Sequence, residues 1–187
     1  SRLGANEFAR LLTAHDEGFR RIVSSIPGAE VLKDLGDGFM AKFDTASHAV
    51  QAALLFEESV AADKSMKVRI GLHLGEVTDI GDDIHGKPKI VGLAADLAAR
   101  VMSLALPGQI LMTRAAFNDA RQYVRKHPAI AEGETESSAL VLKWMAHGQY
   151  LFKGNDDPLE VFEVGAAGIA PLRAPQDTEK ARRAVRV

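Results

Sequence analysis

The segment from Lys33 to Gly38 contains the residues of this chain that are best arranged for chemistry. Gly36-Asp37-Gly38 is typical of a tight turn between two strand-like runs, so the segment predicts a β-hairpin with a carboxylate at its tip. Such an acid can bind Mg²⁺ or Mn²⁺, because these hard ions take one or two carboxylates and leave their other positions to phosphate and water. An ordinary surface turn explains the same residues, so the choice between a metal-binding tip and a plain turn depends on the rest of the chain.

The composition excludes several classes of protein. The chain has 187 residues, a net charge of −2 and no cysteine. These values exclude a disulfide scaffold, a thiolate zinc site and a cysteine nucleophile, and they argue against nucleic acid as a partner. No apolar run is long enough to enter and cross a membrane, and no signal-peptide pattern opens the chain, so the expected location is cytoplasmic.

The spacing of apolar residues predicts an α+β fold with a mostly antiparallel sheet. The expected helices cover residues 8–23, 45–60, 92–106 and 114–125, and the expected strands cover 29–32, 39–43, 68–74, 109–112, 140–145, 149–152 and 159–164. Thr45 is the expected N-cap of the second helix, and the polar residues 79–89 predict a loop. Residues 1–165 are therefore expected to form one domain. Residues 166–187 are rich in Ala, Gly, Pro and charge, and predict a flexible tail or a linker to a further domain.

Three phrases and a late turn occur in order along the chain. They are Lys33-x-x-Gly36-Asp37-Gly38, residues 69–77 (RIGLHLGEV), residues 98–110 (AARVMSLALPGQI) and Phe152-Lys153-Gly154. Together they resemble the catalytic domain of class III adenylate and guanylate cyclases, over nearly all of the chain from the first helix to Val164. The resemblance, together with the apolar pattern, implies a ferredoxin-like βαββαβ core with helices on one face of the sheet.

The resemblance implies a nucleotidyl cyclase. In that reaction the ribose 3′-hydroxyl of ATP or GTP attacks the α-phosphate, which gives a 3′,5′-cyclic nucleotide and releases pyrophosphate. Two Mg²⁺ or Mn²⁺ ions per site would polarise the attacking and leaving oxygens, and cationic side chains would meet the charge on the phosphates. The family also implies a head-to-tail homodimer in which each of two sites takes residues from both chains.

Four residues match the family's site. Asp37 matches its second metal-binding aspartate, and Lys33 matches the lysine that contacts the purine edge. Arg100 matches the transition-state arginine, whose planar guanidinium suits phosphate oxygens, and Lys153 matches the lysine of the terminal phosphates. The family's first metal-binding aspartate belongs to a strand before the opening helix. It is absent here, because the sequence begins with residues that resemble those just after that motif.

Two positions depart from the family. Asp96 replaces the asparagine that orients the ribose, and an extra anion beside a triphosphate is unfavourable unless it is protonated or paired with metal. Lys89 replaces the second base-specifying residue, three positions before Gly92, and lysine has no acceptor for the adenine amino group. An alternative register uses residues 83–86 (DIHG) for that phrase, but the Gly92 register keeps the spacing to Arg100. The choice between ATP and GTP stays open, and relaxed discrimination is expected.

The same residues also have interpretations without chemistry. Asp96 and Arg100 are one helical turn apart and could form a surface ion pair, and Lys33 alone could be a solvated lysine. His73 has no metal-ligand spacing to the other polar residues and is expected to be satisfied beside the sheet. The basic residues of the tail suit a solvated linker; these are Lys180, Arg182, Arg183 and Arg186.

Three functions therefore remain open. The first is an active cyclase, and the second is a degenerate cyclase homology domain that serves as a nucleotide-binding or regulatory dimerisation module. A hydrolase that uses the same metal site on nucleoside triphosphates is a more distant third.

Overall fold

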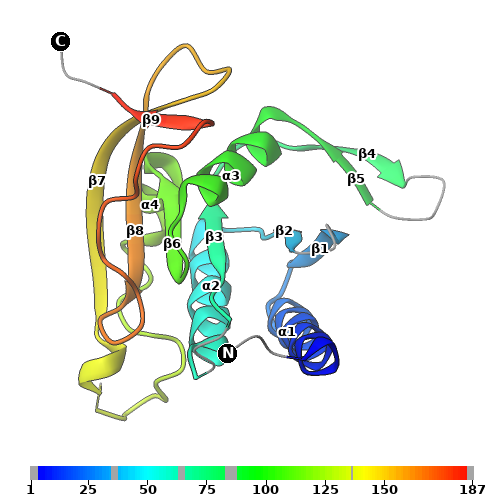
Figure 1. Ribbon diagram of the computed structural model, residues 1–187, viewed down its shortest axis with the longest axis vertical. Helices are drawn as coiled ribbons and strands as arrows, with labels where there is room; N and C mark the ends of the chain where they lie inside the picture. The colour runs from blue at the N-terminus through cyan, green and yellow to red at the C-terminus, as the bar shows by residue number, and fades with distance from the viewer. Residues whose placement is uncertain (1–3, 35–37, 63–65, 83–87, 136, 185–187) are drawn as a thin grey trace.

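The computed structural model describes residues 4–34, 38–62, 66–82, 88–135 and 137–184 (Figure 1). The helices are α1 (Ala5–Ser24), α2 (Ala46–Ala61), α3 (Leu93–Leu104), α4 (Arg114–Ala120) and the short 3₁₀ helix η1 (Ser138–Leu140). The strands are β1 (Glu30–Asp34), β2 (Phe39–Lys42), β3 (Arg69–Leu72), β4 (Thr78–Asp82), β5 (Pro88–Val91), β6 (Gln109–Thr113), β7 (Leu142–Phe152), β8 (Leu159–Ala166) and β9 (Ala181–Arg183). Within the described ranges, no helix is both long and apolar enough to cross a bilayer.

The central sheet has the strand order β3-β6-β8-β7-β9. Among the described strands of this sheet, only β3 and β6 pair in parallel, whereas β6, β8, β7 and β9 follow one another in antiparallel pairs. The predicted α+β class with a mostly antiparallel sheet is confirmed. β1 pairs with β2, and β4 pairs with β5, in two separate two-stranded ribbons.

Helices cover both faces of the central sheet, so the expectation of helices on one face is wrong. Successive residues of β6 point to opposite faces because side chains alternate along a strand. Ile110 and Met112 pack in a core with α2 and α4, while Leu111 packs with Val101 and Leu104 of α3 on the other face. The helix α3 therefore lies on the opposite side of the sheet from α2.

Aromatic contacts attach α1 and the first hairpin to the body of the fold. Phe19 of α1 stacks on Phe39 of β2 with ring centroids 4.8 Å apart, and its ring meets Phe56 of α2 edge-on at 5.2 Å.

The helix α2 begins as expected, since the hydroxyl of Thr45 accepts a hydrogen bond from the backbone N–H of His48 at 3.1 Å.

The predicted hairpin is confirmed by the antiparallel pairing of β1 and β2, in which Asp34 faces Phe39. Its tip, with Gly36 and Asp37, lies outside the described residues.

The expected loop at residues 79–89 was wrong in part, because β4 and β5 form an antiparallel ribbon there. Figure 1 shows this ribbon reaching away from the central sheet, and α3 leading back from it.

The described part of the segment after residue 165, residues 166–184, is packed against the sheet and is not the flexible tail that its composition predicts. β9 pairs with β7 at the edge of the sheet, and Ala181 is 2% exposed. Main-chain hydrogen bonds hold the segment, and these do not depend on apolar side chains.

Two further element boundaries differ from the prediction. β7 is one strand, with a register shift between Ala146 and Gly148, where two strands were expected. α4 ends at Ala120 instead of continuing to residue 125.

Candidate active site

The position of α3 is set by a close contact with β3. A Cβ atom on Gly71 would lie 2.2 Å from the backbone nitrogen of Met102 and 2.4 Å from the backbone oxygen of Ala98. Only glycine permits this approach, since neither neighbouring atom belongs to a flexible side chain. The glycine of the second phrase therefore lets the helix that carries Arg100 lie directly on the sheet.

The turn between β7 and β8 presents Lys153 to solvent. Phe152, the last residue of β7, is fully buried in the core beneath α3. Gly154 has a φ of +84°, which glycine adopts without strain, and the backbone N–H of Asn155 donates to the carbonyl of Phe152 at 2.9 Å. A buried anchor and a closed turn thus fix the main chain on both sides of the exposed lysine.

Arg100 of α3 is docked on this turn. Its Nη1 atom donates to the carbonyl of Lys153 at 2.5 Å and to Oδ1 of Asn155 at 3.3 Å. Both acceptors are neutral oxygens, and no ion pair within the described part of the chain joins Arg100 to a carboxylate. The guanidinium is therefore oriented while its full charge stays available for an anion. We call these three residues the Arg100 corner.

Asp96 lies one turn before Arg100 on α3 and is exposed. Among the described residues no ion pair links the two side chains, so the alternative interpretation of Asp96 and Arg100 as a surface ion pair is not observed. The carboxylate of Asp96 is thus free to face a ligand that approaches this face of the helix.

The two lysines assigned to the purine lie on neighbouring strands. Lys33 is exposed on β1, and Lys89 belongs to β5, which lies beside β1. No hydrogen bond or ion pair between described residues connects Lys33 with the Arg100 corner. One chain therefore presents these two groups of residues on separate elements.

The predicted metal ligand, Asp37, lies outside the described residues, as does the alternative base-specifying phrase at residues 83–86. In the ranges that are described, no three His, Asp or Glu side chains gather in a way that could hold a metal ion. The structure therefore leaves the role of Asp37 as a prediction.

His73, which follows β3, is satisfied beside the sheet as expected. Its Nδ1 atom lies 2.7 Å from the hydroxyl of Thr113 at the end of β6. Burial lowers the pKa of this histidine below its ordinary value of 6.5, so the neutral imidazole dominates at pH 7.

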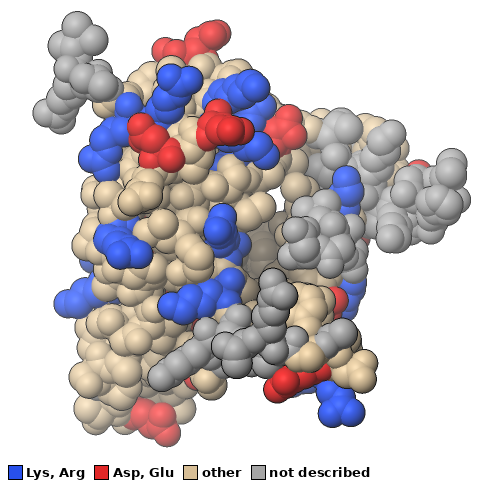
Figure 2. Space-filling view, in the orientation of Figure 1, with Lys and Arg blue, Asp and Glu red and all other residues tan. Residues whose placement is uncertain are grey.

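The region around α3 and the β4–β5 ribbon exposes large apolar side chains to solvent. Their exposed fractions are Leu74 43%, Val77 46%, Ile80 50% and Leu93 64%. Two hollows of about 480 and 360 Å³ are lined by residues outside the Arg100 corner. On the face shown in Figure 2, basic and acidic side chains are mixed over the end of the molecule that carries β9.

Sequence reasoning did not identify Asn155 or the docking of Arg100 on main-chain atoms. A carbonyl acceptor has no sequence signature, because every residue supplies one. The phrase Phe152-Lys153-Gly154 indicated a turn and its lysine, and it did not extend to Asn155. The side chain of Asn155 becomes meaningful once α3 and the β7–β8 turn are seen to meet.

Proteins of similar sequence include an uncharacterised protein of Mycobacterium tuberculosis, which is 30% identical over 155 residues. That alignment covers 82% of this chain and 34% of the relative. A Streptomyces coelicolor adenylate cyclase is 30% identical over 130 residues, covering 68% of this chain and 32% of its own length. The chain thus spans about a third of the length of these curated relatives.

Solved structures of cyclases share the fold. An adenylate/guanylate cyclase/hydrolase from Silicibacter pomeroyi superposes with a TM-score of 0.66 at 21% identity, covering 87% of this chain and 86% of that one. The adenylyl cyclase CyaB from P. aeruginosa gives 0.65 at 20% identity, with coverage of 87% and 84%. The family model described as the adenylate and guanylate cyclase catalytic domain matches residues 1–136. The chain belongs to this family of cyclase catalytic domains.

Proposed function

We propose that this chain is the catalytic domain of a nucleotidyl cyclase that converts ATP or GTP to a 3′,5′-cyclic nucleotide and pyrophosphate. The observation that carries the proposal is the Arg100 corner, where a guanidinium is oriented by neutral oxygens next to an exposed lysine. Two cations on a rigid helix and a closed turn suit the phosphates of a nucleoside triphosphate.

In this proposal Arg100 acts on the α-phosphate during the transition state. Its Nη1 atom is engaged by protein oxygens, which leaves the other N–H groups of the guanidinium to donate to phosphate oxygens. Lys153 binds the terminal phosphates through its exposed ammonium group. Because backbone hydrogen bonds hold both residues, little reorganisation is needed when charge develops.

The purine end of the substrate would lie against Lys33 and Lys89. Both side chains donate hydrogen bonds and neither accepts them. They suit the carbonyl oxygen and ring nitrogens of a purine, and they do not select the adenine amino group. The proposal therefore includes relaxed discrimination between ATP and GTP.

The family's use of divalent metal ions gives Asp37 its proposed role. Asp37, between β1 and β2 in the sequence, would supply one carboxylate ligand for Mg²⁺ or Mn²⁺, with substrate phosphates among the other ligands. Such ions supply charge neutralisation at the phosphates and activation of the ribose hydroxyl. Asp96 lies near enough to Arg100 in sequence to contribute to ribose positioning in place of asparagine.

A head-to-tail homodimer would complete the site. No hydrogen bond or ion pair between described residues joins Lys33 to the Arg100 corner, and the exposed apolar side chains of Ile80 on β4 and Leu93 at the start of α3 suit burial against a second copy. In such a dimer, Asp37 of one chain would face Lys33, Arg100 and Lys153 of the other.

A regulatory cyclase-like module is the second candidate. Asp96 and Lys89 favour it, since both depart from the residues that the family places at the ribose and the base. A chain without turnover would still fold, dimerise and bind a nucleotide.

An assay with the full-length protein distinguishes these functions. The protein is incubated with ATP or GTP and Mn²⁺, and cyclic nucleotide and pyrophosphate are measured. Arg100→Ala should lower kcat more than it raises KM, while Arg125→Ala is a matched control, since Arg125 also bonds a backbone carbonyl but lies after α4. Nucleotide binding without product supports the module. Release of inorganic phosphate alone indicates a hydrolase.

Complementation tests the shared site. Asp37→Ala and Arg100→Ala proteins should each be inactive, and a mixture should recover activity because one site of the mixed dimer keeps both residues. A mixture that associates but stays inactive contradicts shared sites.

A further inference from the structure

The strand β9 holds the turn that carries Lys153. It pairs with the end of β7, with Phe152 opposite Ala181 and Tyr150 opposite Arg183. The backbone N–H of Lys153 donates to the carbonyl of Lys180 at 2.8 Å. The carbonyl of Lys153 meanwhile accepts the hydrogen bond of Arg100. The main chain of Lys153 is therefore held on one side by the C-terminal segment and on the other by Arg100.

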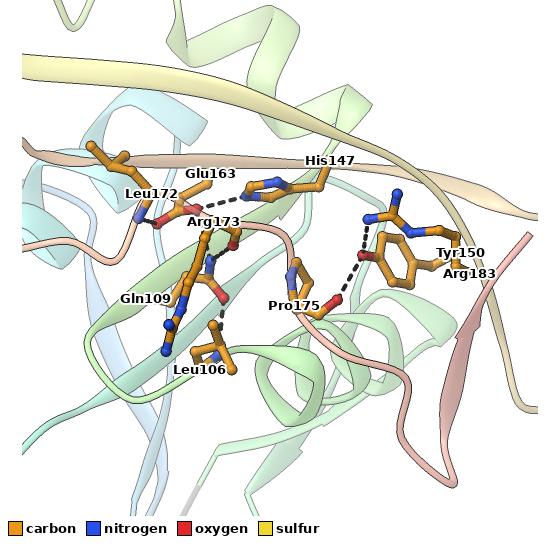
Figure 3. Close-up of polar contacts among 9 residues, drawn as sticks. All are labelled: Leu106, Gln109, His147, Tyr150, Glu163, Leu172, Arg173, Pro175 and Arg183. Carbon is orange, nitrogen blue, oxygen red and sulfur yellow. Dashed lines mark hydrogen bonds and ion pairs between the residues drawn. The ribbon is translucent and has the colours of Figure 1, made fainter.

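The chain that leads to β9 is fixed to the face of the sheet by buried polar groups (Figure 3). The Glu163 carboxylate accepts from the backbone N–H of Leu172 at 2.9 Å, and it lies 2.6 Å from Nε2 of His147. The side-chain amide of Gln109 donates to the same carboxylate at 2.7 Å and to the carbonyl of Arg173 at 2.9 Å. Such a satisfied buried network specifies one path for the chain.

A second set of contacts fixes the register of β9. The hydroxyl of Tyr150 donates to the carbonyl of Pro175 at 3.0 Å and accepts from Nη2 of Arg183 at 3.0 Å (Figure 3). The guanidinium of Arg183 also lies 5.4 Å from the centre of the Tyr150 ring. Tyr150 is fully buried, so this arrangement cannot slide along β7 without breaking buried hydrogen bonds.

The turn before β9 is closed by one threonine. The hydroxyl of Thr178 accepts from the backbone N–H of Lys180 at 3.3 Å and of Ala181 at 3.1 Å. Oδ1 of Asp177 accepts from the backbone N–H of Arg183 at 2.9 Å. These local bonds orient the carbonyl of Lys180 towards Lys153.

The same strand also contacts the core beneath Arg100. Ala181 belongs to the buried cluster that contains Val101 and Leu104 of α3. β9 therefore touches both elements that supply a cation to the Arg100 corner: it pairs with the strand that ends before Lys153, and it packs in the core with α3.

We propose that the C-terminal segment of residues 172–184 is a positioning element for phosphate binding, which sets the main chain of Lys153 so that its ammonium group and the Arg100 guanidinium address the same triphosphate. Thr178 and Asp177 are positioning residues that act through Lys180 and Lys153, and they do not touch the substrate. This inference rests on the proposed cyclase function. A movement of any chain attached after β9 could therefore be transmitted through β9 to Lys153, at the phosphate end of the site.

The test compares Thr178→Val, which removes the hydroxyl with little change in shape, with Thr178→Ser, which retains it. Thr13→Val is a matched control, because its hydroxyl bonds a carbonyl on α1, far along the chain from Lys153 and β9. Amide hydrogen exchange at Lys153 reports the bond to Lys180 directly. Steady-state kinetics of the full-length protein with MgATP or MnGTP, and inhibition by pyrophosphate, report the site.

Thr178→Val should speed exchange at Lys153 and weaken pyrophosphate inhibition on the order of tenfold, since small misplacements of positioned groups have large effects. Thr178→Ser and Thr13→Val should behave as wild type. In a Lys153→Ala background Thr178→Val should add little to the loss, because both changes act on one residue. If Thr178→Val fails to fold, Asp177→Ala against Asp177→Asn makes the same comparison.

The outcomes separate this inference from the proposed function. Faster exchange with unchanged pyrophosphate inhibition overturns the positioning role, as does full additivity with Lys153→Ala. Unchanged exchange at Lys153 overturns it as well. If the wild type neither forms cyclic nucleotide nor binds pyrophosphate, the proposed function fails and the phosphate role of Lys153 fails with it.

Discussion

The buried carboxyl group of Glu57 predicts that the free energy of unfolding falls as the pH rises from about 4.5 to about 8. Glu57 lies in α2 and is 2% exposed, and neither of its carboxyl oxygens has a hydrogen-bond partner among the described residues. Burial, and secondarily the negative charge of Glu163, raise the pKa of Glu57 from 4.5 to about 8. The folded protein therefore holds this side chain as the neutral acid at pH 7.

The direction of the pH effect follows from proton binding. Between pH 4.5 and 8 the folded state keeps a proton on Glu57 that the unfolded state has released. The free energy of unfolding must then fall as pH rises through this interval. Each unit of pKa difference corresponds to about 1.4 kcal/mol, so the full interval corresponds to on the order of 5 kcal/mol. The stabilising contribution is complete below pH 4.5 and lost above pH 8.

Urea unfolding between pH 5 and pH 9, followed by circular dichroism, measures this slope. Glu57→Gln should remove most of it, because the amide stays neutral at every pH. Glu58→Gln is the matched control, since Glu58 is the exposed neighbour on the same helix. Equal pH dependence in wild type and Glu57→Gln would refute the assignment of a neutral, buried carboxyl group.

Three further substitutions test how the site is supported. Gly71→Ala should displace α3 from β3 and lower the free energy of unfolding by roughly 1–3 kcal/mol, because the new methyl group meets backbone atoms. Urea unfolding measures this loss, and a stability equal to that of the wild type would contradict the close contact. Thr45→Ala should cost about 1 kcal/mol through the lost N-cap of α2, whereas Thr45→Ser should not; a thermal melt compares them. Arg100→Lys should lower kcat despite its charge, because lysine lacks the planar fork that bonds the turn and that would also bond a phosphate in the proposed function; wild-type kinetics would contradict that role.

The sequence predicted those elements that bury one face. α1, α2 and α3 carry apolar residues at helical spacing, and β6 and β8 carry the apolar runs of a sheet interior, so their periods are visible. β4 was missed because residues such as Ile80 are exposed, so no buried face imposes an alternation on this strand. A strand without a buried face leaves little pattern to detect.

The C-terminal segment was misread for a different reason. Its composition of Ala, Gly, Pro and charge is typical of a linker, yet its order comes from main-chain pairing and from partners elsewhere in the chain. Glu163 and Gln109 hold its backbone, and neither was singled out in the sequence. Long-range hydrogen bonds between side chain and backbone have no local signature.

The candidate site was likewise predictable from the sequence only in part. The positions of Arg100 and Lys153 could be assigned through the family's phrases, but their mutual contact runs through a carbonyl that any residue would supply. The residues that match the family therefore do not by themselves determine this geometry. It is determined by Gly71, which lets α3 approach the sheet, and by β9, which pairs beside the turn that carries Lys153. Gly71 and Lys180 lie more than a hundred positions apart, and each acts on one of the two cations. A change in either should therefore alter phosphate binding while leaving every matching site residue in place.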